Sequence, residues 1–436
     1  MNYIEAMNYI HEVGNFGSNY GLERTLKLLE LLGNPHEKTK FIHIAGTNGK
    51  GSTTAIISEI LKESGFKVGM YTSPYLEEFE ERIQINGVNI PKETLAILIT
   101  EIKVAVEEVI RQGYNHPTEF EIITCLMFLY FAKEEVDYAV VEVGLGGRLD
   151  STNVILPKVS VIASISFDHM NLLGNTLYEI AKEKAGIIKN HVPVVIYPQE
   201  EEALKAIKEK CLETKSDLVV SDPSKGVFLK VLNEDKVYQL VKVSIDNKEF
   251  EVKLPLLGEH QIKNLMLALT AYKVLCEKEG MEFNIDVIKE AVKNVKWIGR
   301  LEIMNKEPLL VIDGAHNIQG ITQLEKNIHK YFKYNRLYLL LGILADKEVD
   351  KMVKVIVQDA YKVIALTPMS IRAENAVELK KVIDKYNNNN CVALENYDEA
   401  LKLALEEAHE DDLILVSGSL YMIGDMRKRI RKFFDK

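Results

Sequence analysis

Short runs of β-branched residues alternate with longer amphipathic segments through most of this 436-residue chain. The alternation is typical of an α/β fold with a mainly parallel sheet, because each helix returns the chain to the edge where the next strand starts. The run at residues 138–143 is apolar on both faces, which favours a position at the centre of the sheet. The pattern predicts strands at residues 41–45, 67–71, 138–143, 159–165 and 192–196.

The pattern changes between residues 226 and 254, where polar and apolar residues alternate. This period of two, with a turn candidate at Asp246-Asn247, predicts antiparallel hairpins appended to the first domain. Helical patterns follow at residues 260–278 and 285–294.

A second β/α series begins near Trp297. We therefore predict two domains, one at residues 1–296 with the mainly parallel sheet and a smaller, Rossmann-like α/β domain at residues 297–436. The asparagine run at 387–390 is predicted to be an exposed loop.

Composition narrows the classes of partner. The net charge of −10 argues against duplex nucleic acid or an anionic membrane, since both attract basic surfaces. The N-terminus does not resemble a signal peptide, and no apolar run reaches the roughly 18 residues of a membrane span. The four cysteines form no CxxC pair, which favours a reducing compartment over a disulfide framework or a zinc site. We expect a monomeric cytoplasmic protein that acts on small molecules.

Residues 46–52, Gly-Thr-Asn-Gly-Lys-Gly-Ser, lie between the strand at 41–45 and a predicted helix at 52–64. Glycines let backbone N–H groups approach phosphate oxygens, the helix N-terminus adds partial positive charge, and Lys50 neutralises the β/γ region. The general P-loop consensus is not met, because Ile44 occupies the place of its first glycine and Gly51 follows the lysine. A tight turn that caps a helix is the alternative, but the strand–loop–helix order favours phosphate binding.

Polar residues follow three strands of the same predicted sheet. Glu142 ends the apolar strand, Ser73 follows the strand at 67–71, and Asp168-His169 follows the strand at 159–165. Open α/β sheets bind ligands at the carboxyl ends of their strands, and Mg²⁺ takes a few hard oxygen ligands there. Each residue alone could be an ordinary exposed or turn residue. Together, at the ends of three strands of one sheet, they indicate side chains that meet at a common site. Lys184 lies in a run of charged residues, which by itself predicts a solvated helix face.

The second domain has its own polar loop where an apolar strand gives way to a helix, at Asp313 and His316. Asn317 is also a good helix cap, and Arg300 suits a nucleotide phosphate. Residues 418–421 open the last helix, which is another start that favours anions. A ligand site between the domains is the natural inference.

Taken together, these segments resemble folylpolyglutamate synthase and dihydrofolate synthase, which are members of the Mur ligase superfamily. The resemblance implies a P-loop-containing Mur-ligase-type N-terminal domain. The motifs that carry it are GTNGKGS (46–52), TSPYL (72–76), ERIQING (81–87), PTEFE (117–121), VEVGLGGRLDSTN (141–153), DHMNLLG (168–174), EKAGIIK (183–189), GEHQIKN (258–264), GRLE (299–302) and DGAHN (313–317).

The resemblance implies a role for each matched position. ATP would be bound by Thr47, Asn48, Gly49, Lys50, Gly51, Ser52, Asn264, Arg300 and Asp313. Mg²⁺ would be bound by Ser73, Glu142 and His169, and the family also allows a monovalent cation such as K⁺. The residues closest to the chemistry would be Lys50, His316 and Lys184, the last as a carbamylated lysine. Folate would be bound by Arg82, Thr118, Phe120, Glu121 and Asp150. Phe120 suits a flat pterin ring, although packing in a helix core is its ordinary alternative.

One residue departs from the family pattern. Tyr75 stands in TSPYL where many members carry histidine, which leaves Ser73 intact but puts any role of that histidine in doubt. The implied activity is a ligase in which ATP phosphorylates the carboxylate of folate or dihydropteroate, and the amino group of L-glutamate then displaces phosphate.

Two other functions compete with this one. The first is another Mur-type ligase acting on a cell-wall nucleotide precursor, against which the GLGGRLD and PTEFE segments argue. The second is a P-loop switch or transport ATPase that serves as an interaction module. The irregular loop and the absence of an NKxD-type motif weigh against a GTPase of that kind.

Overall fold

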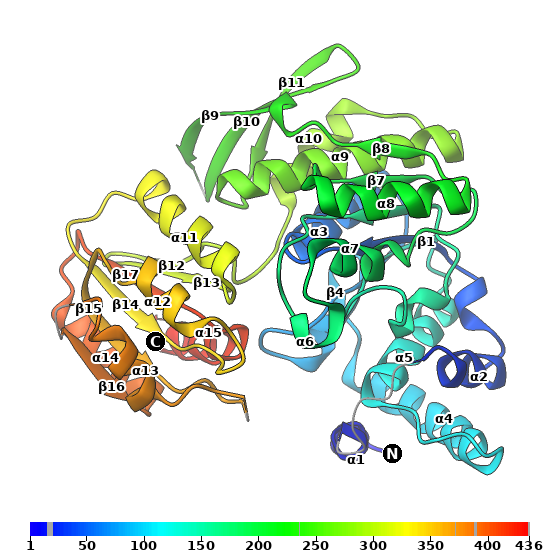
Figure 1. The fold of residues 1–436 in the computed structure, drawn as a ribbon, viewed down its shortest axis with the longest axis horizontal. Coiled ribbons are helices and arrows are strands. Elements are labelled where there is room, and N and C mark those ends of the chain that lie inside the picture. Colours follow the sequence, from blue (N-terminus) through cyan, green and yellow to red (C-terminus); the bar gives the residue numbers. More distant parts are fainter. Residues whose placement is uncertain (15–20, 235, 371, 388–389, 435–436) are drawn as a thin grey trace.

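The computed structural model describes residues 1–14, 21–234, 236–370, 372–387 and 390–434. Within these ranges the strands form three sheets. Figure 1 shows a larger N-terminal unit beside a smaller C-terminal unit, with the middle sheet above them. No helix within the described ranges is both long and apolar enough to cross a membrane.

The first sheet has eight described strands in the order β4-β3-β2-β5-β1-β6-β7-β8. Its core is parallel, whereas β3 and β4 form an antiparallel ribbon at one edge that the sequence pattern did not predict. The apolar strand β5 lies between β2 and β1, so its predicted central position is confirmed. The bounds are β1 Lys40–Ala45, β2 Val68–Tyr71, β3 Ile83–Ile85, β4 Val88–Asn89, β5 Tyr138–Glu142, β6 Val159–Ile162, β7 Val194–Ile196 and β8 Leu218–Val220.

Helices cover both faces of this sheet, because its strands are apolar on both sides. One face packs on α3 (Lys50–Glu63) and α9 (Glu259–Glu279), and α10 (Ile285–Asn294) packs on α3 and on the middle sheet. At one end the other face packs on α5 (Glu119–Lys133), against which α1 (Tyr3–Val13), α2 (Glu23–Leu31) and α4 (Lys92–Arg111) pack. At the other end it packs on α7 (Leu177–Ala185) and α8 (Glu201–Thr214).

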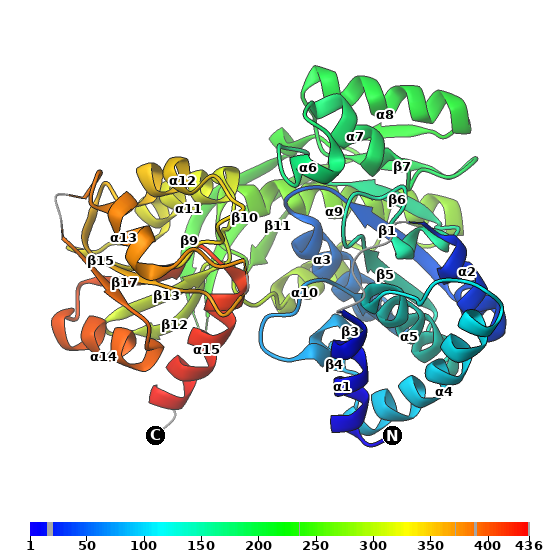
Figure 2. The ribbon, with the colours of Figure 1, turned by 60° about the horizontal axis from the view of Figure 1, so that its bottom comes forward.

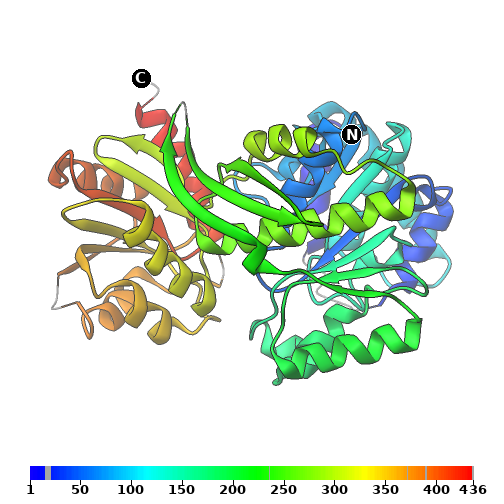
Figure 3. The same ribbon diagram turned by 90° about the horizontal axis from the view of Figure 1, so that it is seen from above.

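The middle sheet is antiparallel, as the alternating pattern predicts. Its strands are β9 (Gly226–Asn233), β10 (Val237–Ile245) and β11 (Lys248–Leu254), and Asp246 and Asn247 form the turn with positive φ. This sheet packs on both units rather than on the first alone, because Phe228 contacts the core around α9 and also the core of the C-terminal unit. Figure 3 shows it lying across the two units.

The C-terminal sheet has six described strands in the order β12-β13-β17-β14-β15-β16. They are β12 (Glu302–Lys306), β13 (Leu309–Asp313), β14 (Leu337–Leu341), β15 (Ala360–Leu366), β16 (Cys391–Leu394) and β17 (Leu413–Ser417). All pairs are parallel except β12 with β13, and β12 was not predicted. One face carries α11 (Ile318–Tyr331), α12 (Val349–Ile356) and α13 (Ala376–Ile383), and the other carries α14 (Tyr397–Glu407) and α15 (Leu420–Phe434).

The predicted exposed loop at 387–390 needs a correction at its first residue. Asn387 is buried, and its Nδ2 donates to the carbonyl oxygens of Val357 (2.8 Å) and Ala360 (2.9 Å). These bonds fasten the segment after α13 to the turn between α12 and β15, which a polar sequence run does not reveal. Asn390 is exposed as predicted, whereas residues 388 and 389 lie outside the described ranges.

Candidate active site

A cavity of about 620 Å³ lies between the two units, at the carboxyl ends of their strands. Residues predicted for three different roles line it together. From the N-terminal unit these are Ser73, Arg82, Thr118, Phe120, Glu121, Asp150 and His169, and from the C-terminal unit His316. We refer to it as the first cavity.

A second cavity of about 610 Å³ is lined by Gly51, Glu142 and Arg300, among other residues. Ser73, Pro74 and Leu420 line both cavities, so the two meet there. The first and second cavities are therefore neighbouring compartments on either side of the segment that follows β2.

The predicted phosphate loop connects β1 to α3, as the sequence indicates. Lys50 is the first residue of α3, and its Nζ lies 3.7 Å from Glu142 Oε1 and donates to Thr47 O at 3.2 Å. Two loop glycines, Gly49 and Gly51, let neighbouring side chains approach the backbone more closely than a Cβ atom would permit. A Cβ atom at Gly49 would lie 2.5 Å from Oδ1 of Asn264, and one at Gly51 would lie 2.3 Å from the Trp297 ring.

Side chains on both units hold this loop in place. The Thr47 hydroxyl exchanges hydrogen bonds with the backbone of Ser166, both at 3.1 Å. Asn48 accepts a bond from Asn317 Nδ2 (3.1 Å) and donates to Gln319. Asn317 also caps α11 by accepting from Gly320 N, so its predicted capping role is confirmed and its amide serves the loop as well.

Glu142 is buried at the end of β5, and burial raises its pKa to about 7. Lys50 and the backbone N–H of Ser73 act in the opposite direction, but they do not offset the loss of water. Ser73 and Glu142 are therefore neighbours, as predicted. A carboxylate that is costly to ionise without a further cation is suited to a metal ion, which compensates its charge.

Lys184 corrects the expectation of a solvated helix face, because its side chain is buried at the end of α7. Its Nζ donates to the carbonyl oxygen of Gly46, the first residue of the predicted phosphate loop, at 2.9 Å. Burial, followed by the nearby charge of Lys50, lowers the pKa of Lys184 to about 7. A large fraction of this amine is consequently neutral and nucleophilic near neutral pH.

Lys347, which sequence reasoning missed, joins the two units across the first cavity. Its Nζ lies 2.8 Å from Asp168 Oδ1. Burial alone would raise the pKa of Asp168, but Lys347 lowers it to about 2. His169, the neighbour of Asp168, has a left-handed backbone conformation and a pKa lowered mainly by burial. The available signal was a lysine shortly after the apolar strand β14.

Asp313 and His316 have distinct tasks in the loop after β13. The Asp313 carboxylate accepts from Leu301 N and Ala315 N, both at 2.8 Å, and so fixes the backbone around Arg300. His316 Nδ1 donates to Gly314 O at 2.8 Å, which leaves Nε2 as the free acceptor on a ring that lines the first cavity. Burial lowers the pKa of His316 to about 4, so the ring is neutral at physiological pH.

The predicted folate residues lie together, but some of their polar atoms are already engaged. Glu121 is buried, pairs with Arg24 at 2.9 Å and forms a capping box with Thr118 at the start of α5. Asp150 accepts from Leu145 N (2.9 Å) and Thr152 N (3.0 Å), so it shapes the loop after β5.

Phe120 and Arg82 both line the first cavity. The Phe120 ring touches the backbone at Gly144, where a Cβ atom would lie 2.5 Å away. The Arg82 guanidinium lies 5.4 Å from the Tyr75 ring centre, within cation–π range. Tyr75, the residue that departs from the family pattern, therefore supports the predicted folate residue Arg82.

The start of α15 forms the remaining wall of the first cavity. Ser419 is fully buried there, and its hydroxyl has no hydrogen-bond partner among the described residues. Arg372 lines the same cavity and pairs with Asp346 at 3.2 Å. The uncapped helix start, the free hydroxyl and nearby cations favour an anion.

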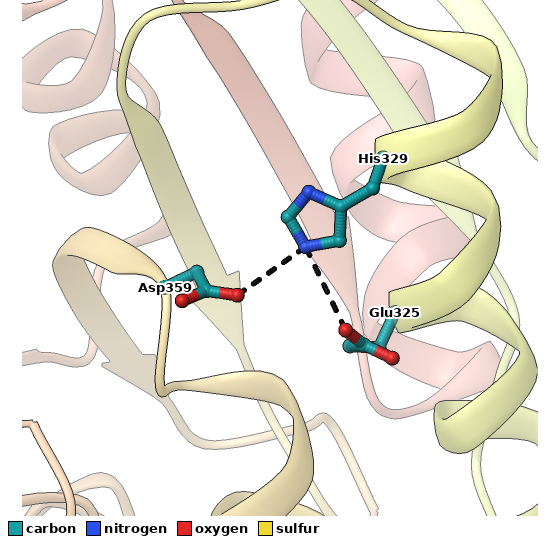
Figure 4. A group of neighbouring side chains, drawn as sticks. All are labelled: Glu325, His329 and Asp359. Carbon is teal, nitrogen blue, oxygen red and sulfur yellow. Dashed lines mark ion pairs between the residues drawn. The ribbon is translucent and has the colours of Figure 1, made fainter.

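A further group of ionisable residues lies outside both cavities. On α11, His329 Nε2 is 3.6 Å from Glu325 Oε1, and it is 3.3 Å from Oδ2 of Asp359, which precedes β15 (Figure 4). Such atoms are of types that bind metals, but exposed acidic groups often pair with a histidine without an ion. We assign this group to surface pairing between α11 and the segment before β15.

Comparison with known families gives the context for this geometry. Residues 44–272 match the model of the Mur ligase middle domain, and residues 299–420 match that of the Mur ligase glutamate ligase domain. The dihydrofolate synthase/folylpolyglutamate synthase of Bacillus subtilis is 36% identical over 433 residues, which cover 98% of this chain and 99% of that protein. This chain belongs to the folylpolyglutamate/dihydrofolate synthase family of Mur ligases.

Solved structures agree with the assignment. Folylpolyglutamate synthase (FPGS) of Mycobacterium tuberculosis with ADP and AMPPCP has a TM-score of 0.87 and 29% identity, covering 100% of this chain and 99% of that one. A structure described as an FPGS-AMPPCP-folate complex has a TM-score of 0.83 and 33% identity, covering 98% and 99% of the two chains. The predicted Mur-ligase fold is thereby confirmed.

Proposed function

We propose that this protein is an ATP-dependent ligase that joins the amino group of L-glutamate to the carboxylate of a folate. The observation that carries the proposal is the meeting of the two cavities at Ser73-Pro74. A nucleotide on the phosphate-loop side and a pterin on the Phe120 side would bring the γ-phosphate and the acceptor carboxylate to this junction. Relatives that carry both synthase names and structures of FPGS with an ATP analogue and folate support the same assignment.

The first step is phosphoryl transfer. A carboxylate oxygen of the acceptor attacks the γ-phosphorus, and the bond to the β/γ-bridging oxygen breaks to give an acyl phosphate and ADP. Lys50 and the start of α3 stabilise the charge on the phosphoryl oxygens. The buried Glu142, with Ser73 and His169, would hold Mg²⁺, which supplies further positive charge there when bound.

The second step forms the amide. The amino nitrogen of L-glutamate attacks the carbonyl carbon, the carbon–oxygen bond to phosphate breaks, and the proton lost from the nitrogen leaves with the phosphate. His316 Nε2 is a neutral hydrogen-bond acceptor on the cavity wall, and it would orient the amino group by accepting a hydrogen bond from one of its N–H groups. A glutamate carboxylate would bind at the start of α15, where the Ser419 hydroxyl, Lys347 and Arg372 line the cavity.

The proposal extends to Lys184 as a carbamate. Its amine, with a pKa of about 7 in a buried site, is reactive toward CO₂ under neutral conditions. The resulting carbamate would give a negative oxygen group close to the metal-binding side chains. The proposal also includes a bound monovalent cation such as K⁺ in addition to Mg²⁺.

The remaining expectations are part of the same proposal. Residue 296 as the domain boundary is supported by its position between α10 and β12. A monomer is supported by the site, since one chain supplies the residues that line both cavities. A cytoplasmic location is supported by four buried free cysteines. Small-molecule substrates are sufficient for the proposed reaction, with no nucleic acid or membrane.

The test offers purified protein ATP, L-glutamate and either dihydropteroate or a tetrahydrofolate, and identifies the products by mass. Glutamylated product from at least one acceptor is expected, and the pair of assays decides between dihydrofolate synthase activity, folate extension and both. ADP release with UDP-muramyl substrates, but not with pterins, would refute the proposal in favour of a cell-wall ligase. ADP release without any glutamylated product would favour a plain ATPase.

A further inference from the structure

The loop that follows Pro74 is docked on helix α15 of the C-terminal unit. We refer to residues 75–82 as the docked loop. Ser73, just before it, lines both cavities, and Arg82, its last residue, lines the first cavity. Figure 2 shows α15 on the side of the C-terminal unit that faces the N-terminal unit.

The docked loop is stiffened from within. The Glu81 carboxylate accepts hydrogen bonds from the backbone N–H groups of Leu76 (2.8 Å), Glu77 (3.1 Å) and Glu78 (3.0 Å). One carboxylate therefore fastens the tip of the loop to the short 3₁₀ helix that ends at Arg82. A displacement of the tip is consequently transmitted to both ends of the loop.

Backbone contact brings the tip directly against α15. A Cβ atom at Gly424 would lie 1.8 Å from Leu76 O, so a side chain at position 424 could not be accommodated without separating loop and helix. Leu76 itself packs on the apolar core of the C-terminal unit.

Buried charge reinforces this contact. Glu77, with only 6% of its side chain exposed, pairs with Arg427 and Arg431, and Lys428 Nζ donates to Glu77 O at 2.6 Å. Arg427 is 14% exposed and also holds Glu302, with its Nη2 2.6 Å from Oε1. Burial by itself would lower the pKa of Arg427, but the carboxylates of Glu302 and Glu77 raise it above its usual value.

Glu302 extends the chain of contacts to the second cavity. Its Oε2 accepts from Gly299 N at 2.7 Å, next to Arg300, which lines that cavity. Arg427 thus connects the loop between Ser73 and Arg82 with the segment of Arg300. Its own helix begins beside Ser419 on the wall of the first cavity.

We propose that Arg427 is a positioning residue for the ligation: through Glu77 and Glu302 it holds the docked loop on α15, and this keeps the two units closed over the reacting groups. The inference rests on the proposed ligase function. When the contact is lost, the acyl phosphate is open to water, whose oxygen forms a bond to the carbonyl carbon while the bond to phosphate breaks. The products are then the free acceptor and phosphate, and ATP is consumed without ligation.

The experiment measures glutamylated product formed per ADP released, with ATP, L-glutamate and tetrahydrofolate. This ratio does not depend on how much of a variant is folded. Arg427→Met is expected to lower the ratio, and to lower kcat for ligation on the order of 10- to 100-fold, because a shift of about 1 Å at a reacting group has an effect of this size. Gly424→Ala separates the same surfaces without a change in charge and is expected to lower the ratio as well.

Arg429→Met is the matched control, because Arg429 lies on the same helix but pairs with Asp398 on α14, within the C-terminal unit. It should keep the wild-type ratio, and Arg427→Lys should recover part of it. A wild-type ratio in both Arg427→Met and Gly424→Ala would overturn the inference, and so would an equal loss in Arg429→Met. If the wild-type protein itself forms no glutamylated product, the proposed function fails and the inference fails with it.

Discussion

Replacing Glu142 by glutamine should stabilise the protein in the absence of ligands while it disables the site. The carboxylate is buried at the end of β5, and its closest cation, Lys50, lies 3.7 Å away. Water solvates the ionised carboxylate in the unfolded chain, whereas in the folded chain Lys50 and a backbone N–H group replace only part of that hydration. Active sites commonly hold groups of this kind, whose cost in stability is recovered only when the ligand binds.

The magnitude follows from the pKa of Glu142, which rises from 4.5 to about 7 on folding. This rise corresponds to a loss of about 3 kcal/mol in the free energy of unfolding when the group is ionised in both states. Because the folded protein holds the proton more tightly, the penalty is absent below pH 4.5. It grows between pH 4.5 and 7 and is complete above pH 7.

The assay is thermal unfolding of wild-type and Glu142→Gln protein at pH 8 and at pH 4.5, without nucleotide or Mg²⁺. The variant should melt several degrees higher at pH 8, and the difference should disappear at pH 4.5. Glu121→Gln is the matched control, because Glu121 is equally buried but pairs with Arg24 at 2.9 Å. Breaking that pair should destabilise the protein by about 3 kcal/mol. A Glu142→Gln variant that melts lower than wild type at pH 8 would refute the reasoning.

Four further results are expected. Lys50→Ala should abolish glutamate-dependent ADP release, and normal turnover would disprove the phosphate-loop assignment. The intact protein should gain the mass of one CO₂ at Lys184 in native mass spectrometry at pH 8 with bicarbonate; an intact mass without this gain in fully active protein would exclude the carbamate. Phe120→Ala should raise KM for the folate at least about 10-fold, as expected for a lost aromatic contact, while KM for ATP stays constant; equal changes in both would argue against a pterin contact. Thr118→Ala should lower the free energy of unfolding by about 1 kcal/mol through loss of the α5 cap, and denaturant titration would contradict this if the midpoint were unchanged.

Much of the fold could be predicted because its signals are local. The β-branched run at 138–143 became the central strand β5, and the alternation after residue 226 became the β9–β11 sheet. The predicted phosphate loop could be located because a glycine-rich turn between a strand and a helix is typical of phosphate-binding sites, and the structure confirms the strand, turn and helix. Edge strands such as β12 escaped prediction, since they are short and only half-buried and so carry a weak pattern.

The candidate site also has features that the sequence predicts and features that only the structure reveals. The sequence placed polar residues at the carboxyl ends of strands, and the topology of a parallel sheet brings such ends to one edge. The resemblance supplied the residues predicted to bind folate, and the structure gathers them in one cavity. The capping box of Thr118 and Glu121 is local and has a sequence signature, whereas the buried pairing of Glu121 with Arg24, 97 positions earlier, depends on the tertiary structure.

The sequence by itself determined the alternation of central strands and helices, the predicted phosphate loop and the family to which this chain belongs. The tertiary structure alone decided which charges are buried. Lys184 looks like part of a solvated face, yet it lies under Gly46, 138 positions earlier in the chain. Arg427 is one of several basic residues on its helix, and only the docking of Glu77, 350 positions away, distinguishes it. Burial and ion pairing depend on neighbours that are close in space but remote in sequence, so no local pattern of residues can report them.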